Sequence, residues 1–185
     1  MRTLVHEYDW PDRVVVGTVG RPGERTFYLQ ARAGARFTSV ALEKEQSFLL
    51  ADKMDELLDE LTADEDNPVN APTEIPVELV DDDPLDQPVE EQFRAGAMRL
   101  AWDPRTAQVV LEAFPVELSR EDDGIAPEDE EDDEPSEVLL IRIPVGTARA
   151  FAQRTRKVVH SGRPLCPLCG QPVSPDGHVC DLTEE

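Results

Sequence analysis

Residues 13–61 read RVVVGTVGRPGERTFYLQARAGARFTSVALEKEQSFLLADKMDELLDEL, and the hydrophobic period changes once within them. Three short runs rich in Val, Phe, Tyr and Thr, at 13–19, 25–31 and 37–42, are separated by Gly-containing turns and predict a three-stranded meander. From about residue 43 to 61 the apolar residues recur every three or four positions, which predicts an amphipathic helix. These apolar residues are Leu50, Met54, Leu57, Leu58 and Leu61.

The second half of the chain shows the same order of elements. Strands are predicted at 93–102, 108–116 and 137–143, and a helix at about 147–159. The two halves share no convincing residue-level match, so the repeat concerns the architecture alone. We therefore predict an α+β fold in a βββα-βββα order, with one antiparallel sheet or two small ones covered by two helices.

Composition restricts the range of functions. The chain has 185 residues, with 40 acidic and 18 basic side chains and a formal net charge of -22. No apolar run reaches the roughly 18 residues of a membrane-spanning helix, so we expect a cytoplasmic protein without a membrane partner. The strong negative charge argues against nucleic acid as a partner, because a polyanion is repelled.

Charge is unevenly distributed along the chain. Acidic residues concentrate at 64–91 and 121–136, where repulsion and scarce apolar surface predict flexible insertions. Basic residues cluster in and around the predicted second helix, before the last cysteines, and they are the feature that would permit weak nucleic-acid binding. A solvated helix face is the simpler interpretation of them. They are Arg142, Arg149, Arg154, Arg156, Lys157 and Arg163.

The last part of the chain contains a sharp metal-ligand pattern. Cys166 and Cys169 form a Cys-x-x-Cys pair, and His178 and Cys180 follow a Pro-Asp-Gly turn. Thiolate and imidazole groups are the preferred ligands of tetrahedral zinc, and a set of four leaves no open position for water or substrate. The pattern therefore predicts a structural Zn²⁺ ion in a zinc-knuckle tail at 161–185, attached to an α+β domain at 1–160.

Two other interpretations of these residues stay open. His160 could replace His178 as a ligand, although its spacing is less suitable. A redox role would need a helix starting at Cys166, and the prolines around it disfavour one.

Several stretches resemble a known protein family. They are Gly17 to Ala31, the helix start Val40 to Gln46, Glu91 to Asp103, and Gly162 onward into Cys-Pro-Leu-Cys-Gly. Together they resemble the actinobacterial family called domain of unknown function 3090. The resemblance implies a cytosolic bacterial protein with a Cys-Cys-His-Cys tail, and the family has no established activity to transfer.

A glycine loop is the main candidate for chemistry in the body of the protein. Gly17, Gly20 and Gly23 lie beside Arg21 and Arg25, and such a loop could bind an anion through backbone N–H groups and guanidinium groups. A phosphate-binding loop normally lies between a strand and a helix. This loop lies between two predicted strands, so a hairpin is the simpler interpretation.

Three functional hypotheses follow. The leading one is a noncatalytic adaptor or regulatory module that interacts with another protein, because no catalytic Ser-His-Asp or Cys-His set can be assembled from the sequence. The second is an enzyme or binding protein for a phosphorylated or anionic small molecule, held by Arg21 and Arg25. The third is weak nucleic-acid binding through the basic second helix.

Overall fold

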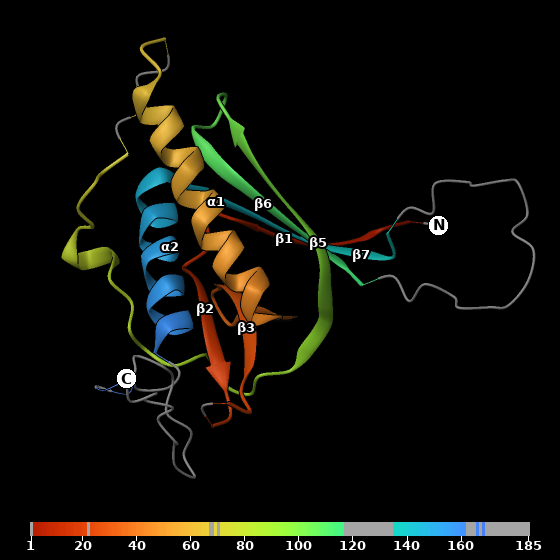
Figure 1. The fold of residues 1–185 in the computed structure, drawn as a ribbon. Coiled ribbons are helices and arrows are strands. Elements are labelled where there is room, and N and C mark those ends of the chain that lie inside the picture. Colours follow the sequence, from red (N-terminus) through yellow and green to blue (C-terminus); the bar gives the residue numbers. More distant parts are fainter. Residues whose placement is uncertain are drawn as a thin grey trace, which may run out of the picture.

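The computed structural model describes residues 2–21, 23–66, 69, 71–116, 135–161, 166 and 168. Within these residues, seven strands form one sheet and two α-helices pack against it (Figure 1). The strands are β1 (Leu4–Asp9), β2 (Arg13–Val19), β3 (Thr26–Ala33), β4 (Arg36–Leu42), β5 (Glu91–Asp103), β6 (Gln108–Pro115) and β7 (Glu137–Pro144). The helices are α1 (Lys44–Ala63) and α2 (Val145–His160), with a short 3-10 turn, η1 (Val77–Leu79).

The sheet is mixed, with the order β1-β7-β6-β5-β4-β3-β2. Strands β4 and β5 pair in parallel, as do β1 and β7, and the other neighbours are antiparallel. The predicted α+β class is confirmed, but the antiparallel sheet is wrong. Between β4 and β5 the chain passes through α1 and a long connection, and such a crossover brings the next strand back in the same direction.

Strand β1 is missing from the βββα-βββα order that the sequence predicted. Tyr8 is its one fully buried residue, and the Tyr8 hydroxyl hydrogen-bonds Thr38 Oγ1 of β4 at 2.7 Å. The Arg36 guanidinium lies 4.4 Å from the centroid of the Tyr8 ring. A short strand with one buried position has too weak a period to be recognised from sequence, and its place depends on partners far along the chain.

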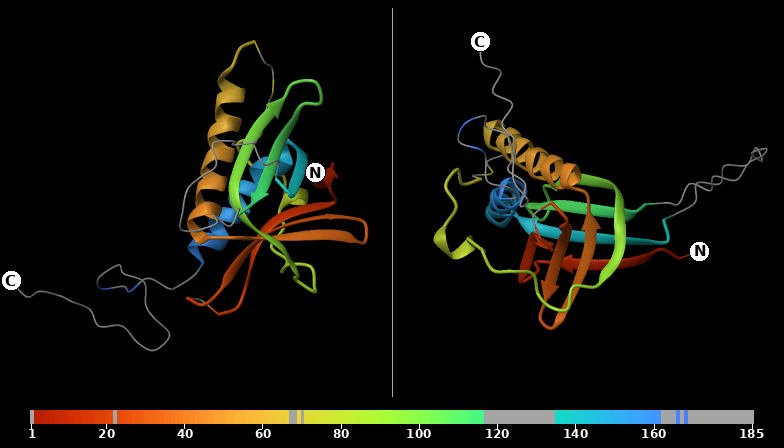
Figure 2. Two further views of the ribbon diagram at one scale, coloured as in Figure 1. Left: turned by 90° about the vertical axis from the view of Figure 1, so that its right-hand side faces the viewer. Right: turned by 60° about the horizontal axis from the view of Figure 1, so that its bottom comes forward.

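Both helices lie on the same side of a strongly curled sheet (Figure 2). On α1 the core side chains are Leu50, Met54, Leu58 and Leu61, as the three- and four-residue spacing predicted. On α2 they include Phe151 and Val159. Strand β5 joins the two parts of the sheet, because it pairs with β4 near its start and with β6 further on. Neither helix of the described residues is long and apolar enough to cross a membrane.

The connection from α1 to β5 passes around the edge strand β2 (Figure 1). Its residues 81–86, which we call the strap, cover the outer face of the β2–β3 hairpin. Leu85 of the strap packs against Gly17, where an added Cβ would come within 2.6 Å of it. The Gln30 amide of β3 donates to the Asp86 carbonyl at 3.1 Å, and its oxygen accepts from the Asp86 N–H at 2.8 Å.

Two arginines, one from β2 and one from α2, bind the strap through hydrogen bonds. Arg13 donates from Nε and Nη2 to the two oxygens of Asp81, at 2.6 and 3.0 Å. Arg154 of α2 donates to the carbonyls of Val16 and Asp83, at 3.1 and 2.7 Å. The sequence predicted a flexible insertion over 64–91, but this part of it is bound to the body of the protein. The predicted insertion at 121–136 lies almost wholly outside the described residues.

Candidate functional site

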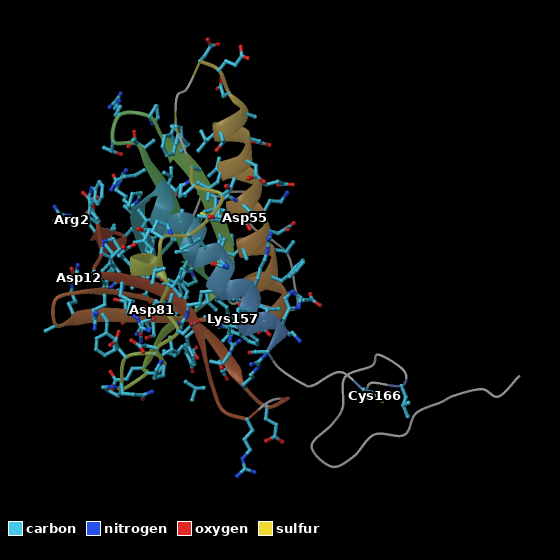
Figure 3. All side chains as sticks on the ribbon, turned by 90° about the vertical axis from the view of Figure 1, so that its left-hand side faces the viewer. Arg2, Asp12, Asp55, Asp81, Lys157 and Cys166 are labelled. Atoms are coloured by element: carbon cyan, nitrogen blue, oxygen red, sulfur yellow. The ribbon has the colours of Figure 1, made fainter. Side chains whose placement is uncertain are left out.

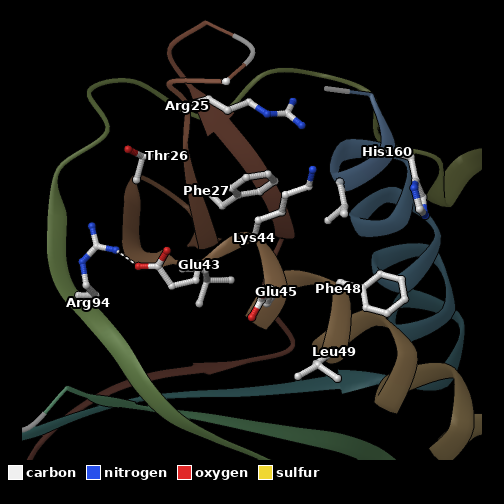
Figure 4. Close-up of a pocket in the computed structure, with 13 residues that line it drawn as sticks. Arg25, Thr26, Phe27, Glu43, Lys44, Glu45, Phe48, Leu49, Arg94 and His160 are labelled. Atoms are coloured by element: carbon white, nitrogen blue, oxygen red, sulfur yellow. Dashed lines mark hydrogen bonds and ion pairs between the residues drawn. The ribbon is translucent and has the colours of Figure 1, made fainter. Parts of the chain in front are cut away.

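A cleft of about 1410 Å³ lies where the β2–β3 hairpin, the start of α1, β5 and the end of α2 meet (Figure 4). Its lining combines charged and apolar side chains. The ionisable ones are Arg25, Glu43, Lys44, Glu45, Arg94 and His160, and the apolar ones are Phe27, Leu42, Phe48, Leu49 and Val159. These residues come from β3, β4, α1, β5, α2 and the turn before β3, so the cleft exists only in the folded chain.

The turn of the β2–β3 hairpin positions Arg25. Gly20 and Gly23 have φ angles of 107° and 93°, in the region that favours glycine, and the Glu24 N–H donates to the Arg21 carbonyl at 2.9 Å. Strands β2 and β3 pair in register up to Val19 and Thr26. The hairpin interpretation of this glycine loop is therefore confirmed.

The first turn of α1 positions Lys44. Gln46 Oε1 accepts the backbone N–H of Glu43 at 2.8 Å, which caps the helix start. The Gln46 amide nitrogen also donates to the carbonyls of Ala95 and Gly96 in β5, each at 3.0 Å. One glutamine thus caps the helix and fixes it against the strand that supplies the opposite wall of the cleft.

The cations of the cleft differ in their pairing. Arg94 forms an ion pair with Glu43 at 2.7 Å (Figure 4). Arg25 donates to the Val158 carbonyl at 3.1 Å, and its guanidinium lies 4.9 Å from the Phe27 ring centroid. Partial burial lowers the pKa of Arg25 from its ordinary value. Among the described residues, neither Arg25 nor Lys44 forms an ion pair with a carboxylate.

The basic residues of α2 have a different environment. Acidic residues lie on both sides of this helix, with Asp55 of α1 on one side and Asp81 on the other (Figure 3). Each arginine and lysine of α2 has a carboxylate partner within 3.1 Å. They are Arg149 (Asp55, Asp59), Arg154 (Asp81), Arg156 (Asp52, Asp55) and Lys157 (Asp82). Of the other two basic residues of the predicted cluster, Arg142 pairs with Asp103 at 3.2 Å and Arg163 lies outside the described residues.

The structure separates the two arginines that the sequence suggested for anion binding. Arg25 lines the cleft, whereas Arg21 is exposed in the hairpin turn and is absent from the described lining. Lys44, and not Arg21, lines the cleft together with Arg25. Nothing local in the sequence indicates that residues 25 and 44 share a cleft.

The predicted metal ligands fall mostly outside the described residues. Cys169, His178 and Cys180 are not described, and Cys166 is 7 % exposed. In the part of the chain that is described, no group of three His, Cys, Asp or Glu side chains could hold a metal ion. His160 forms part of the cleft wall, with its ring centroid 6.3 Å from that of Phe48 in an edge-on contact. The zinc site stays a prediction.

Two apolar residues of the cleft were not recognised in the sequence. Phe48 and Leu49 are 40 % and 54 % exposed, respectively. They lie beside the buried stripe of α1, outside its three- and four-residue spacing. Two large apolar residues outside that spacing were the one sequence feature that indicated a second apolar surface.

The described lining contains few polar groups besides its cations. Its hydroxyl group comes from Thr26, and its two carboxylates are Glu43, already paired with Arg94, and the exposed Glu45. The imidazole of His160 also lies on this cleft, in an edge-on contact with Phe48. Among the described residues, the cleft contains two cations without a carboxylate partner, Arg25 and Lys44, beside an apolar surface.

The fold and the cleft define a small α+β protein with a curled mixed sheet and a partly cationic cleft. The chain belongs to the family described as "Protein of unknown function (DUF3090)", whose model matches residues 6–180. No match was found among curated proteins or among solved structures.

Proposed function

We propose that this protein is a noncatalytic adaptor or regulatory module that binds an anionic group of its partner in the cleft at the start of α1. The observation that carries the proposal is Arg25, a partly buried guanidinium without a carboxylate partner among the described residues. Lys44 adds a second available cation on the same cleft.

In so acidic a chain, a guanidinium without a carboxylate partner among the described residues is notable. With 40 acidic and 18 basic side chains, partners for a cation are plentiful, and every arginine and lysine of α2 has one. A guanidinium that has already lost part of its hydration gains more from a carboxylate or phosphate than a fully hydrated one does. Arg25 should therefore bind a carboxylate or phosphate group that does not belong to the described residues.

The contacts of the described residues also bear on the two other hypotheses, binding of an anionic small molecule and binding of nucleic acid. An anionic small molecule would use the same two cations, so it is the second candidate for the cleft. Nucleic-acid binding through α2 would have to compete with the carboxylates of α1 and the strap, which already pair with the arginines and the lysine of that helix.

The binding site can be tested by NMR titration of the full-length protein with inorganic phosphate and citrate. We expect the largest shifts at the backbone and side-chain N–H groups of Arg25 and at Lys44, and their loss in Arg25→Ala. Lys53→Ala is the matched control, because Lys53 lies on α1, outside the described lining, and pairs with Glu56. Equal shifts in wild type and Arg25→Ala, or shifts confined to other surfaces, would overturn the proposal.

For the tail we propose a structural zinc ion held by Cys166, Cys169, His178 and Cys180, in a protein of the reducing cytoplasm. The donor set fits zinc, because three thiolates and one imidazole complete a tetrahedral shell. Binding would stabilise the tail itself, since the ligands are brought together only when it folds.

Elemental analysis of freshly purified protein tests the metal. We expect about one zinc ion per chain in the wild type and its loss in Cys166→Ser. Chelation should change the spectroscopic signals of residues beyond about 163 and leave those of the sheet unchanged. A metal-free protein with titratable thiols would contradict the zinc site and favour a redox pair.

A further inference from the structure

The cleft has an apolar end as well as a cationic one. Arg25 and Lys44 extend into the upper part of the cleft, while Phe48 and Leu49 lie toward its lower edge (Figure 4). Both apolar side chains are large and more than a third exposed. Large apolar groups beside a hollow mark binding surfaces more often than isolated ones do.

This apolar surface is continuous across both helices. The Phe48 ring of α1 meets the His160 ring of α2 edge-on, with 6.3 Å between centroids. Val159, buried in the wall, backs the same surface, and Phe27 forms the floor beneath the Arg25 guanidinium. A ligand in the cleft would therefore meet aromatic and aliphatic groups within the same hollow as the two cations.

The size of the cleft indicates how large its ligand is. Pockets for small molecules are typically about 300–1,000 Å³. The cleft here, at about 1410 Å³, exceeds that range and opens to solvent. Several residues of an extended peptide would fill it, whereas a single phosphate or a small organic acid would leave its apolar part in contact with water.

We propose that the cleft binds a peptide segment of another protein that carries an acidic side chain next to a large apolar one. This inference rests on the proposed function and names the chemistry of the partner. The acidic group pairs with Arg25 and Lys44, and the apolar residue packs on Phe48 and Leu49. Charge complementarity fixes the orientation of the peptide, and burial of the apolar anchor supplies much of the affinity.

The charge of the whole protein supports a short segment as the contact. At a net charge of -22, an extended acidic surface or a nucleic acid would be repelled. A peptide with one or two carboxylates beside the cations experiences local attraction and little of that repulsion, because distant charges are screened by salt.

The test is selection of a displayed library of random dodecapeptides on the immobilised full-length protein. We expect the enriched peptides to share an Asp or Glu within two or three positions of a Leu, Ile, Phe or Trp. Enrichment of basic or purely polar peptides, or none at all, would overturn the inference.

The affinity of an enriched peptide for variants tests the location of the site. Fluorescence anisotropy should show about tenfold weaker binding for both Arg25→Ala and Leu49→Ser, because each removes one of the two contacts. Leu49 is exposed, so its replacement does not disturb the core. Lys53→Ala should bind as the wild type does. Unchanged affinity in both cleft variants would overturn the inference.

The phosphate titration separates this inference from the proposed function. If phosphate shifts Arg25 in the NMR titration but no acidic-apolar peptide is enriched, the cleft binds anions and the peptide inference fails. If neither phosphate nor peptide affects Arg25, both fail.

Discussion

Arg13 and Arg25 stand near opposite ends of the same β2–β3 hairpin, and their surroundings differ sharply. Arg13 is 9 % exposed and donates to both oxygens of Asp81 and to the carbonyls of Asp83 and Pro84. Arg25 donates to one carbonyl and lies over an aromatic ring. Arg13 donates from Nε, Nη1 and Nη2, whereas Arg25 donates from Nη2 alone among the described residues.

The pKa values of the two arginines move in opposite directions, because only Arg13 has carboxylate partners that offset burial. The hydrogen bonds from Arg13 to Asp81 raise the pKa of Arg13, and they outweigh the opposing effect of burial. Burial alone lowers the pKa of Arg25. A buried cation such as Arg13 stabilises the fold because acidic partners offset its loss of hydration. A partly buried cation without such partners, as Arg25 is among the described residues, gains free energy when an anionic ligand binds.

Removal of the saturated arginine should have the largest effect on stability. Arg13→Ala removes the donors to the half-buried Asp81 side chain and to the Pro84 carbonyl, although Arg154 still donates to Asp81 and Asp83. We expect a loss of about 2–4 kcal/mol in the free energy of unfolding, because hydrogen bonds to charged groups contribute most. Urea denaturation followed by circular dichroism measures it. The paired control is Arg25→Ala, for which we expect a loss of about 1 kcal/mol or less. Equal losses in the two variants would refute the contrast between them.

Displacement of the strap by a steric change should have an intermediate effect. A Cβ at Gly17 would lie 2.6 Å from Leu85 side-chain atoms, so Gly17→Ala should destabilise the protein by about 1–3 kcal/mol. Gly34→Ala is a poor control, because Gly34 has a φ of 61°. The double variant Gly17→Ala, Leu85→Ala is better, since it removes the clash. If the second substitution makes Gly17→Ala no less costly, Leu85 is not what fills the space.

Acid should loosen the strap. Burial acts to raise the pKa of Asp81, but the hydrogen bond and charge of Arg13 outweigh it and hold that pKa below its ordinary 3.8. The folded state therefore binds this proton more weakly than the unfolded state, and the stability from Asp81 is present near neutral pH and is lost as the pH falls below about 4. Urea unfolding between pH 7 and 3 should show a smaller difference between wild type and Asp81→Asn at the acid end. A constant difference would contradict this.

A fully exposed ion pair should contribute the least. Lys53 and Glu56 are 2.7 Å apart on the solvent side of α1, with both side chains more than half exposed. Because solvent and salt screen such pairs, Lys53→Ala should leave the melting temperature unchanged within error. A measurable drop would show that proximity alone, without burial, stabilises ion pairs in this protein.

Local sequence signals predicted the elements of the sheet domain well. The first predicted strand, 13–19, coincides with β2, and the helix predicted from about 43 to 61 is α1 at Lys44–Ala63. These elements follow from the period of apolar residues and from turn formers, both of which are local properties. β1 and the parallel pairings escaped prediction because they depend on contacts between distant parts of the chain.

The candidate site was predicted only in part. Arg25 was singled out as an anion ligand from its place beside the glycine loop, and it lines the cleft. Arg21 is exposed and outside the described lining, since adjacency in sequence does not decide which side of a hairpin turn faces the helices. Its predicted role in anion binding stays a prediction. Phe48 and Leu49 were passed over because a helical period identifies the buried face and says nothing of a second apolar surface.

The sequence by itself determined where strands and helices form, how strongly acidic the chain is, and which tail residues could bind zinc. Only the tertiary structure decided which cations have carboxylate partners among the described residues and which do not. Arg13 and Asp81 are 68 positions apart, and Arg149 and Asp55 are 94 apart. Pairing over such separations depends on the path of the chain around the sheet. Local periodicity does not encode that path, so the ion pairs follow from the fold as a whole.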